Sequence, residues 1–377
     1  MRRILYIGSD ASPGMVPFAT SIIRAAIKSK KIEVYAIVVD KDKPLYQTNL
    51  RDLPEGKIHF LQTPKNKLKK YINKFYAIDI LREVKQICSV RKIDVIHLLT
   101  SDDVCATIFR QLKKNAPVYY TVHDVVPHET VYTGIRNYLI CKYLGLCEKK
   151  ITRKADGLVT NSQNQFIRIK SMYPQKKIYF QLFPSLIMSS ILSGERTCQE
   201  IIHIERYILF FGRIEKYKGV EYLCEAFQNN KNLQDYHLVI AGKGQLYFPH
   251  TDDPRVIFIN RFIDDSEVKS LFIKASCVVY PYISATQSGV LSLAYKLQTP
   301  VLVSDVPYFR EVSNEKSCLF FKPTDSKDLS KKLEQLLFHT QLNEMKDAQK
   351  DFYENFYSEH AFITSTERLY DDIAITN

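Results

Sequence analysis

The sequence predicts an α/β fold with two doubly wound parallel sheets, one in each half of the chain. Short apolar runs typical of buried strands alternate with segments of helical spacing, which favours parallel sheets. The alternation breaks once, at residues 182–200, and then restarts. The length of 377 residues fits two domains of about 100–200 residues each. A composition of 45% hydrophobic and 25% charged residues indicates a globular chain.

The first half contains seven apolar runs that read as strands buried on both faces. They cover residues 4–7, 34–39, 58–61, 95–99, 118–122, 158–160 and 178–182. Helical spacing between several of these runs predicts helices such as 18–27, 68–87 and 104–112. Ligands of such a sheet bind beyond the carboxyl ends of its strands.

The second half begins after a linker marked by Pro184, Ser185 and Gly194, where periodicity is lost. Its predicted strands and helices are 207–211, 219–227, 237–241, 256–259, 266–274, 278–282, 289–297 and 301–304, followed by helices at 325–338, 342–357 and 359–373. The sequence therefore predicts a first domain over 1–186, a second over 200–355, and a final helix in 356–377 that packs back on the first. The two Rossmann-like domains are expected to face each other across a cleft.

The charge of the chain is divided unevenly between its halves. Residues 1–190 carry 32 basic and 15 acidic side chains, a net +17, whereas the remainder carries 21 and 26, a net −5. A basic half joined to a mildly acidic half indicates different partners, although a merely solvated surface is an alternative. None of the eight cysteines forms a CxxC motif, so we expect reduced core residues of a cytoplasmic protein.

The loop after the predicted strand at 207–211 is a candidate anion site. Gly212 allows a tight turn, Arg213 and Lys218 add two positive charges, and Gly219 precedes a helix. Cations beside a helix N-terminus suit an anion, most naturally a diphosphate. An ordinary loop with basic residues explains the composition equally well.

The segment "HLVIAGKGQ" at 237–245 runs from a strand into Gly242 and Gly244. Two glycines let a ligand approach the backbone closely, but a structural turn is an equally good explanation.

The segment "YPYISATQSGVLSLAYKLQTPVLVSD" at 280–305 reads as strand, loop, helix, strand. Thr286, Gln287 and Ser288 lead into a helix that begins near Gly289. The first backbone amides of a helix, here including that of Val290, have no partner within the helix. The segment can therefore bind phosphate through its backbone, without a charged side chain.

The first half offers a histidine at the ligand-facing edge of its sheet. His123 and Asp124 follow the predicted strand at 118–122. A lone histidine is more often structural, whereas a His-Asp pair at the end of a strand favours function, so both interpretations stay open.

Two loops of the first half have weaker signals. The loop "GSDASPGM" at 8–15 carries Gly14 but is not GxGxxG, so a dinucleotide cofactor is disfavoured and contact with an acceptor or phosphate is the alternative. The "DKD" at 40–42 lies among lysines and reads as a polar loop rather than a metal site.

Taken together, these segments resemble the family 4 glycosyltransferases, which have the GT-B fold. The resemblance covers nearly the whole chain and is carried by "YTVHD", "ADGLVTNS", "FFGRIEKYKGVEYLCEAF", "LVIAGKGQ" and "PVLVSDVPYFREV", in that order. It implies a hexosyltransferase-like enzyme that retains configuration and needs no metal or other cofactor. It further implies that the C-terminal domain binds the nucleotide-sugar and the N-terminal domain binds the acceptor.

The resemblance also implies roles for individual residues. Arg213 and Lys218 match the basic pair that neutralises the donor diphosphate. Gly14 falls in the glycine loop near the transferred group, and His123 matches the histidine that contacts the donor sugar. Glu311 lies where many relatives have glycines before a glutamate, and this sequence, "VPYFRE", departs from the family pattern because it lacks those glycines.

The chain departs from the family pattern at two acidic positions. Many relatives carry two glutamates separated by seven residues, and alignment on Ser288-Gly289 places Thr286 and Ala294 there. A subset of the family resembles this sequence at these positions. We therefore interpret the change as replacement of the acidic motif by other binding groups, rather than as loss of the site. The side chains and amides of residues 286–290 would then hold sugar and phosphate by hydrogen bonds.

The predicted function is transfer of a sugar from a UDP- or GDP-linked donor to a saccharide or lipid-linked acceptor, in surface polysaccharide or glycolipid synthesis. The basic half suits an anionic membrane surface, which would place a cytoplasmic protein peripherally on the inner face of the membrane. One alternative is a non-catalytic nucleotide-sugar-binding partner subunit, since both glutamates are missing. Another is a different GT-B enzyme, such as an epimerase or a phosphorylase. Nucleic-acid binding is disfavoured because no recognised motif for it is present.

Overall fold

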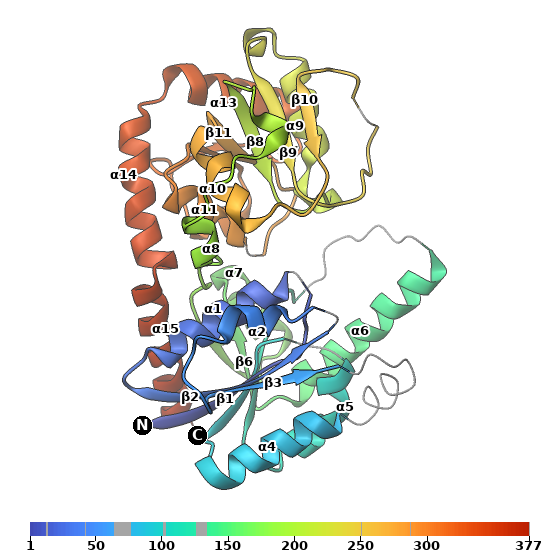
Figure 1. Cartoon of the computed structure of the whole chain (residues 1–377), viewed down its shortest axis with the longest axis vertical. Coiled ribbons are helices and arrows are strands. Elements are labelled where there is room, and N and C mark those ends of the chain that lie inside the picture. Colours follow the sequence, from blue (N-terminus) through green and yellow to red (C-terminus); the bar gives the residue numbers. More distant parts are fainter. Residues whose placement is uncertain are drawn as a thin grey trace. The chain divides into compact units, whose positions relative to one another are not determined.

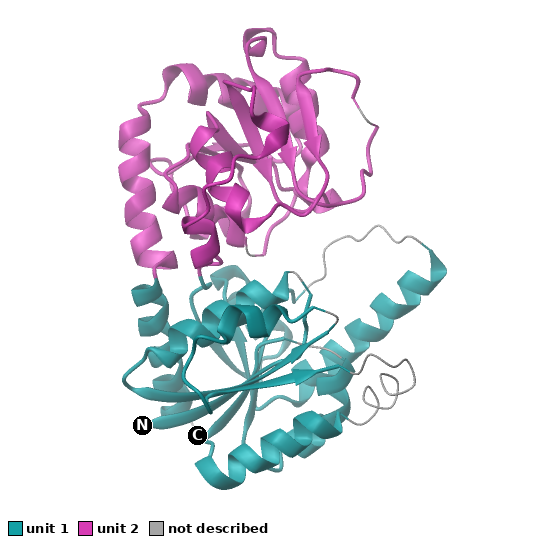
Figure 2. Cartoon of the chain, viewed as in Figure 1, with its two compact units in different colours: residues 1–125, 132–184, 359–377 teal, residues 126–131, 185–358 magenta. Residues whose placement is uncertain are grey.

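The computed structural model describes the chain except residues 13, 42, 64–76, 101–102, 126–133, 250, 287 and 377. The chain forms two compact units (Figure 2). Unit 1 contains Met1–Val125, Tyr132–Pro184 and Glu359–Asn377, and the described part of unit 2 lies within Ser185–Ser358. Among the described helices, none is both long and apolar enough to cross a membrane.

Unit 1 is built on a parallel sheet of seven described strands in the order β3-β2-β1-β4-β5-β6-β7 (Figure 1). The strands are β1 (Arg2–Gly8), β2 (Ile32–Asp40), β3 (Ile58–Gln62), β4 (Val95–Leu98), β5 (Val118–Thr121), β6 (Gly157–Thr160) and β7 (Lys177–Phe180). Neighbouring strands pair in parallel throughout, which confirms the predicted fold class for this half.

Helices cover both faces of this sheet because successive side chains of a strand point to opposite sides. Leu5 and Ile7 of β1 join the core under α4, α5 and the second half of α6. Tyr6, between them, faces Tyr370 of α15, with ring centroids 6.4 Å apart. The described helices of unit 1 are α1 (Met15–Ile27), α2 (Leu45–Leu50), α4 (Ile78–Arg91), α5 (Asp103–Leu112), α6 (Ile135–Lys154), α7 (Gln163–Met172) and α15 (Glu359–Thr376).

Unit 2 repeats the design with a parallel sheet in the order β10-β9-β8-β11-β12-β13. Its strands are β8 (Tyr207–Phe211), β9 (His237–Ala241), β10 (Val256–Ile259), β11 (Cys277–Tyr280), β12 (Val301–Ser304) and β13 (Leu319–Phe321). The edge strand β13 was not predicted, because three apolar residues are too few to distinguish a strand from a buried turn.

The helices of unit 2 alternate with its strands as predicted. They are α8 (Ser189–Leu192), α9 (Val220–Gln228), α10 (Asp265–Lys274), α11 (Gly289–Lys296), α12 (Pro307–Glu311), α13 (Ser326–Glu334) and α14 (Leu342–Phe352). Short 3₁₀ helices are η1 (Gln199–Ile201), η2 (Lys216–Lys218) and η3 (Lys231–Leu233), and π-helical segments are η4 (Gln335–His339) and η5 (Tyr353–Tyr357).

Each sheet has one point where the strand order reverses. In unit 1 the reversal lies between β1 and β4, and in unit 2 it lies between β8 and β11. In open parallel sheets the loops after the two strands at such a point leave in opposite directions, and ligands bind beside them at the carboxyl edge. These two edges are therefore where binding residues are expected.

The final helix, α15, belongs to unit 1 through buried polar contacts. The Tyr370 hydroxyl lies 2.7 Å from His97 Nδ1, and Gln181 Nε2 donates to Thr366 Oγ1 over 2.8 Å. Burial lowers the pKa of His97 to about 3, so its ring is neutral. These hydrogen bonds join the end of the chain to β4 and to the segment after β7.

Candidate functional site

The loops after β8 and β9 in unit 2 are packed backbone to backbone. Gly212 and Gly242 directly follow these neighbouring strands, and their φ angles are 144° and 146°. A Cβ atom on Gly242 would overlap the Gly212 carbonyl oxygen. Only glycine combines this backbone conformation with such a close approach. The structure therefore brings the two predicted glycines together as one platform at the carboxyl edge.

The next glycine of the β9 loop extends this contact. Gly244 forms an isolated parallel bridge with Ile214, and a Cβ atom on Gly244 would overlap the Ile214 backbone. The Asn260 side chain accepts from the Gly244 amide at 3.0 Å and donates to its carbonyl at 2.9 Å. Gly244 thus fixes the two loops to each other.

The loop after β8 also packs against the loop after β11, across the point where strand order reverses. The Ile283 amide donates to the Tyr217 carbonyl over 2.7 Å. Gly219 has a φ of 62°, and a Cβ atom there would overlap the Pro281 carbonyl oxygen. The βα loops of three adjacent strands therefore form one surface.

Lys218 is the buried cation of this surface. Only 8% of the residue is exposed, and its Nζ lies 5.7 Å and 5.5 Å from the ring centroids of Tyr217 and Tyr282. Among the described residues, no carboxylate or hydrogen-bond acceptor contacts Nζ. Burial lowers the pKa of Lys218 to about 8, because removal from water disfavours the ammonium. An anion bound beside Lys218 would supply the missing partner.

Arg213, the other predicted cation, has a different environment. Its side chain is 71% exposed and forms a 2.9 Å ion pair with Glu215. An exposed pair of this kind contributes little to stability, so a diphosphate could replace Glu215 as the partner of Arg213 at small cost. Arg213 and Lys218 leave the same loop, one exposed and one buried.

The N-terminus of α9 is already satisfied by side chains that the sequence analysis did not single out. The Val220 amide donates to the Tyr247 hydroxyl over 3.2 Å, and that hydroxyl hydrogen-bonds to the Glu221 carboxylate. The predicted anion site of this loop therefore depends on its two cations rather than on the first amide of the helix.

The N-terminus of α11 offers backbone donors. Ser288 precedes the helix without a capping side-chain hydrogen bond, and the amides of Gly289 and Val290 have no acceptor among the described residues. The hydroxyl of Tyr282 interacts with Ser288, and the Tyr282 ring faces Lys218. The start of α11 thus lies in the same region as the buried ammonium.

Packing also favours glycine at position 289, because a Cβ atom there would overlap the Leu186 side chain. Of the other predicted contacts, Thr286 is half-buried in the loop before α11, and Gln287 lies outside the described residues. Glu311 is half-buried at the end of α12. Ala294, in the place of the second family glutamate, is fully buried.

His123 in unit 1 is held by contacts on several sides. Its Nε2 lies 2.8 Å from the Leu99 carbonyl and therefore carries the proton, since a carbonyl can only accept. The Phe18 ring packs edge-on at 4.7 Å between centroids, and Gln165 Nε2 donates to the His123 carbonyl over 2.7 Å. Burial lowers the pKa of His123, so the ring is neutral near pH 7.

Gly14 precedes α1 in the loop that follows β1. Its φ of −83° is accessible to any residue, and no atom lies within 4 Å of a Cβ placed there. Nothing in the fold requires a glycine at this position, and the space beside the backbone is open. The rest of the loop is fixed by Thr100, whose hydroxyl accepts from the amides of Ser9 and Asp10.

Two acidic groups that resemble ligand sites have structural partners. The Asp40 carboxylate of the "DKD" segment accepts from the amides of Tyr46 and Gln47, while Asp42 lies outside the described residues. Cys198, Glu200 and Glu267 cluster closely enough to hold a metal ion. However, the Arg261 guanidinium pairs with both glutamates at 2.7 Å and 2.9 Å, and its Nη2 lies 3.5 Å from Cys198 Sγ.

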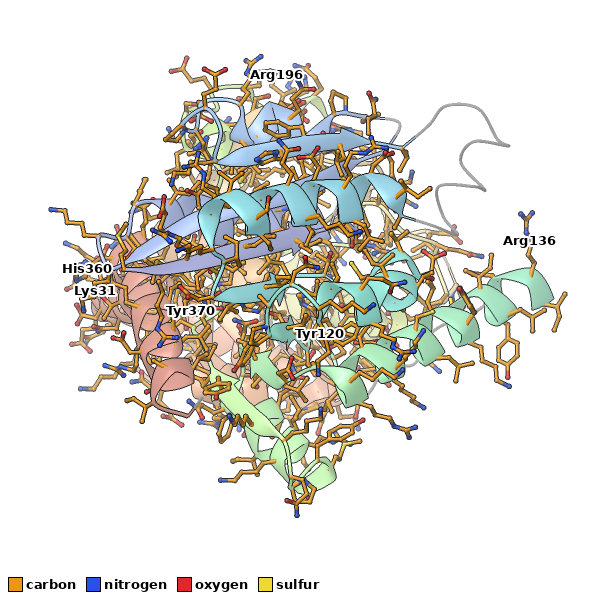
Figure 3. The ribbon with its side chains drawn as sticks, turned by 90° about the horizontal axis from the view of Figure 1, so that it is seen from below. Lys31, Tyr120, Arg136, Arg196, His360 and Tyr370 are labelled. Carbon is orange, nitrogen blue, oxygen red and sulfur yellow. The ribbon has the colours of Figure 1, made fainter. Side chains whose placement is uncertain are left out.

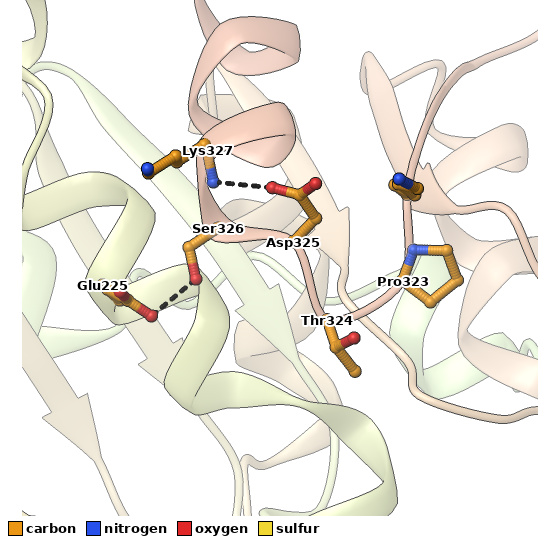
Figure 4. A pocket seen from close by; sticks show the side chains of 7 residues that line it. Glu225, Pro323, Thr324, Asp325, Ser326 and Lys327 are labelled. Carbon is orange, nitrogen blue, oxygen red and sulfur yellow. Dashed lines mark hydrogen bonds between the residues drawn. The ribbon is translucent and has the colours of Figure 1, made fainter.

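A surface hollow of about 410 Å³ lies at the start of α13 (Figure 4). Its lining is held by internal hydrogen bonds, from Ser326 Oγ to Glu225 and from the Lys327 amide to Asp325. None of the predicted donor contacts lines it. We therefore interpret the residues that line this hollow as the cap of α13 rather than as a donor site.

Comparison with known protein families covers both units. Residues 14–179 match the profile described as "Glycosyltransferase Family 4", and residues 205–339 match the profile described as "Glycosyl transferases group 1". Together the two profiles cover most of the chain, including each loop discussed above except the start of the first.

Two curated relatives are similar in sequence. An uncharacterized glycosyltransferase of Methanocaldococcus jannaschii is 28% identical over 163 residues, 40% of this chain and 41% of the relative. The GDP-mannose:glycolipid 4-beta-D-mannosyltransferase of Xanthomonas campestris is 25% identical over 200 residues, 49% of each chain. The match thus spans at most about half the length of these relatives.

A solved structure shares the fold over the whole chain. HepE of Anabaena, determined in complex with UDP and glucose, superposes with a TM-score of 0.68 at 16% identity, covering 99% of this chain and 100% of HepE. At this level of identity the likeness establishes the architecture, which is GT-B.

Proposed function

The chain belongs to the family 4 glycosyltransferases, also called glycosyl transferases group 1, and we propose that it transfers a sugar from a nucleotide-sugar donor to an acceptor. The observation that carries this proposal is the Lys218 ammonium, which is buried in the strand-edge loops of unit 2 and forms no ion pair or hydrogen bond among the described residues, with Glu215 acting on it only from a distance. Burying such a charge is costly unless a ligand pairs with it. The donor diphosphate is the anion that the loop suits best.

The donor would bind to the loops after β8, β9 and β11. Lys218 and Arg213 would neutralise the diphosphate, and the amides of Gly289 and Val290 would donate to its oxygens. The stacked pair of Gly212 and Gly242 would allow the ligand to lie close to the backbone. These groups face charge that increases as the diphosphate leaves, so they would stabilise the transition state more than the ground state.

The reaction is proposed to retain the configuration of the sugar and to use no metal. If the leaving phosphate itself assists the incoming hydroxyl, the protein needs no strong base. A neutral His123 fits this scheme, because a neutral ring suits a hydrogen bond with a sugar hydroxyl better than proton donation at pH 7. His123 is therefore proposed to contact the donor sugar rather than to protonate the leaving group.

Unit 1 is proposed to bind a saccharide or lipid-linked acceptor. The sequence relative in Xanthomonas is named for a glycolipid acceptor, and a net charge of +17 in residues 1–190 suits an anionic, lipid-linked diphosphate. This supports a role in glycolipid or surface polysaccharide synthesis, by a cytoplasmic protein on the inner face of the cell membrane.

A second candidate function is a nucleotide-sugar-binding subunit without its own activity. It is favoured by one observation: alanine fills the second family glutamate position and is completely buried, so no carboxylate serves there. Slow hydrolysis of the bound donor would distinguish the two candidates, because a binding subunit would leave the donor intact.

The proposal is tested by measuring thermal unfolding of the purified protein with a panel of UDP- and GDP-sugars. A donor at 100 times its dissociation constant should stabilise the fold by about 2.7 kcal/mol. Stabilisation by sugars of one nucleotide, with transfer or hydrolysis of the same sugars, is the expected result. An absence of stabilisation by every donor, together with an absence of turnover, would contradict the proposed function.

A further inference from the structure

The helix α6 (Ile135–Lys154) of unit 1 exposes many more apolar side chains than a helix packed on a sheet needs to. Only Cys147, Ile151 and Thr152 are buried, and all three lie in its second half, which packs on α5. The first half extends beyond the other described elements of unit 1 in two perpendicular views, with Arg136 pointing outward near its start (Figures 1 and 3).

Four of the exposed apolar residues form one stripe along α6. We call Ile135, Leu139, Tyr143 and Leu146 the α6 stripe. Their spacings of four, four and three residues place them on a single helix face, and each side chain is between 52% and 74% exposed. Three further large apolar residues, Tyr138, Ile140 and Leu144, are also exposed beside the stripe. Contiguous exposed apolar surface of this kind marks an interaction site.

The charge of α6 indicates which partner the stripe contacts. The helix carries six basic residues and a single acidic one, Glu148, which is half-buried and bonded to the Tyr120 hydroxyl at 3.0 Å. Lys142 flanks the stripe, and Arg153 continues its line seven residues after Leu146. Apolar side chains flanked by lysine and arginine suit the headgroup layer of an anionic bilayer, where basic side chains reach the phosphates.

We propose that α6 is a membrane-docking helix that inserts the α6 stripe into the surface of an anionic lipid bilayer. The inference extends the proposed function, because a lipid-linked acceptor would be presented at such a surface. It does not depend on donor binding, which uses loops of unit 2.

The first test measures binding to vesicles by co-sedimentation, at low salt, with neutral phosphatidylcholine and with phosphatidylcholine containing phosphatidylglycerol. The intact chain should bind anionic vesicles and lose binding as salt rises, since the attraction is screened. Leu139→Ser/Leu146→Ser should lower the partition coefficient at least tenfold. Lys149→Gln/Lys150→Gln should lower it by roughly fivefold for each charge removed.

Matched controls come from unit 2. Ile273 is 58% exposed on α10 and Phe262 is similarly exposed, so Phe262→Ser/Ile273→Ser removes comparable apolar surface. This control should bind vesicles like the unmodified protein. All variants alter exposed side chains, so their melting temperatures and donor-induced stabilisation should be unchanged. A chain that binds vesicles without binding any donor would uphold this inference while contradicting the proposed function.

A second test uses the absence of tryptophan from the sequence. Tyr143→Trp introduces a single fluorophore in the α6 stripe, and Phe262→Trp places one in unit 2. Anionic vesicles should shift the Tyr143→Trp emission to shorter wavelength and brominated lipid should quench it, whereas the Phe262→Trp emission should not change.

Three results would overturn the proposal. The first is undiminished vesicle binding by Leu139→Ser/Leu146→Ser, and the second is equal binding to neutral and anionic vesicles at low salt. The third is a dimer in sedimentation velocity, without lipid, that dissociates in Leu139→Ser/Leu146→Ser. That result would identify a second copy of the chain as the partner of the α6 stripe.

Discussion

The carboxyl edges of the two parallel sheets use the same scaffold for different chemistry. The edge of unit 1 presents His123 as a neutral ring, held between the Leu99 carbonyl and the Phe18 ring. The edge of unit 2 presents stacked glycines, the first amides of α11, for which the described residues offer no acceptor, and the buried Lys218 ammonium. One edge has its polar groups bonded within the protein, and the other retains donors for an anion.

This difference teaches that a parallel sheet fixes where ligands bind but not which ligand binds. Both sets of residues follow the carboxyl ends of parallel strands, where ligands of such sheets bind. The loops then decide the chemistry, because glycine allows close approach, lysine supplies charge, and buried histidine supplies a neutral contact.

The largest effect is expected from removing both cations of the unit 2 edge. Arg213→Ala/Lys218→Ala should reduce sugar transfer by at least a thousandfold, because the leaving diphosphate would lose two charge-assisted contacts. The steady-state transfer rate measures this effect. Near-normal turnover would show that the two cations do not act on the donor. Lys231→Met, a change in an exposed lysine on η3, is the control and should transfer normally.

Gly242→Ala tests the close backbone contact between Gly212 and Gly242. The added Cβ would overlap the Gly212 carbonyl oxygen at a φ of 146°, so the loops after β8 and β9 must separate. We expect a loss of about 3 kcal/mol in unfolding free energy and at least a hundredfold weaker donor binding. Gly145→Ala on α6 has open space and should be neutral or stabilising by up to about 1 kcal/mol. Equal effects of both changes would refute the stacking argument.

His123→Ala tests the neutral group of the unit 1 edge. Loss of one hydrogen bond to a sugar hydroxyl should lower kcat by about tenfold, while the dissociation constant of the nucleoside diphosphate stays the same. Single-turnover kinetics and calorimetry separate the two quantities. A parallel loss of diphosphate affinity would place His123 with the anion contacts instead. His59→Ala, which removes a hydrogen bond to Glu83, controls for general loss of stability in unit 1.

The pH dependence of donor affinity tests whether the Lys218 ammonium of the unit 2 edge pairs with the donor. Lys218 has a pKa of about 8 in the unliganded protein, and a bound diphosphate raises that pKa because it favours the ammonium. Affinity should therefore level off as the pH falls below 8 and decrease by up to tenfold per pH unit above it. Calorimetric titration between pH 7.5 and 9.5 measures the slope. A flat profile, like that expected for Lys218→Met, would contradict this assignment.

The smallest effect on transfer is expected from Tyr370→Phe. The change removes the hydroxyl 2.7 Å from His97 Nδ1 and leaves a buried nitrogen without its partner. We expect a cost of about 1–3 kcal/mol in unfolding free energy and an unchanged transfer rate. Chemical denaturation measures the unfolding free energy, and a transfer assay measures the rate. A reduced transfer rate in a fully folded variant would mean that the buried polar network of unit 1 also serves the reaction.

Most of the fold and part of the unit 2 edge could be predicted from the sequence. The strands of parallel sheets are continuous apolar runs, so their positions and alternation with helices could be read directly, apart from the three-residue β13. Gly212, Gly242 and Lys218 could be assigned because they follow strands whose carboxyl ends meet.

Contacts between distant parts of the chain could not be predicted in the same way. The sequence did not indicate that Tyr247 satisfies the first amide of α9, that Leu186 packs against Gly289, or that Arg213 is exposed while Lys218 is buried. Each of these facts depends on packing between segments that sequence periodicity does not relate. The exposed apolar face of α6 likewise required knowledge of where the sheet ends.

The most direct test of the central claim compares a nucleoside with its diphosphate by calorimetry at pH 7.5. The intact protein should bind either UDP or GDP at least a hundredfold more tightly than uridine or guanosine. Lys218→Met retains the length of the side chain between the tyrosine rings and should lose most of that difference, with nucleoside affinity unchanged. If Lys218→Met kept the full difference between nucleoside and diphosphate, the unit 2 edge would not be the diphosphate site that we propose.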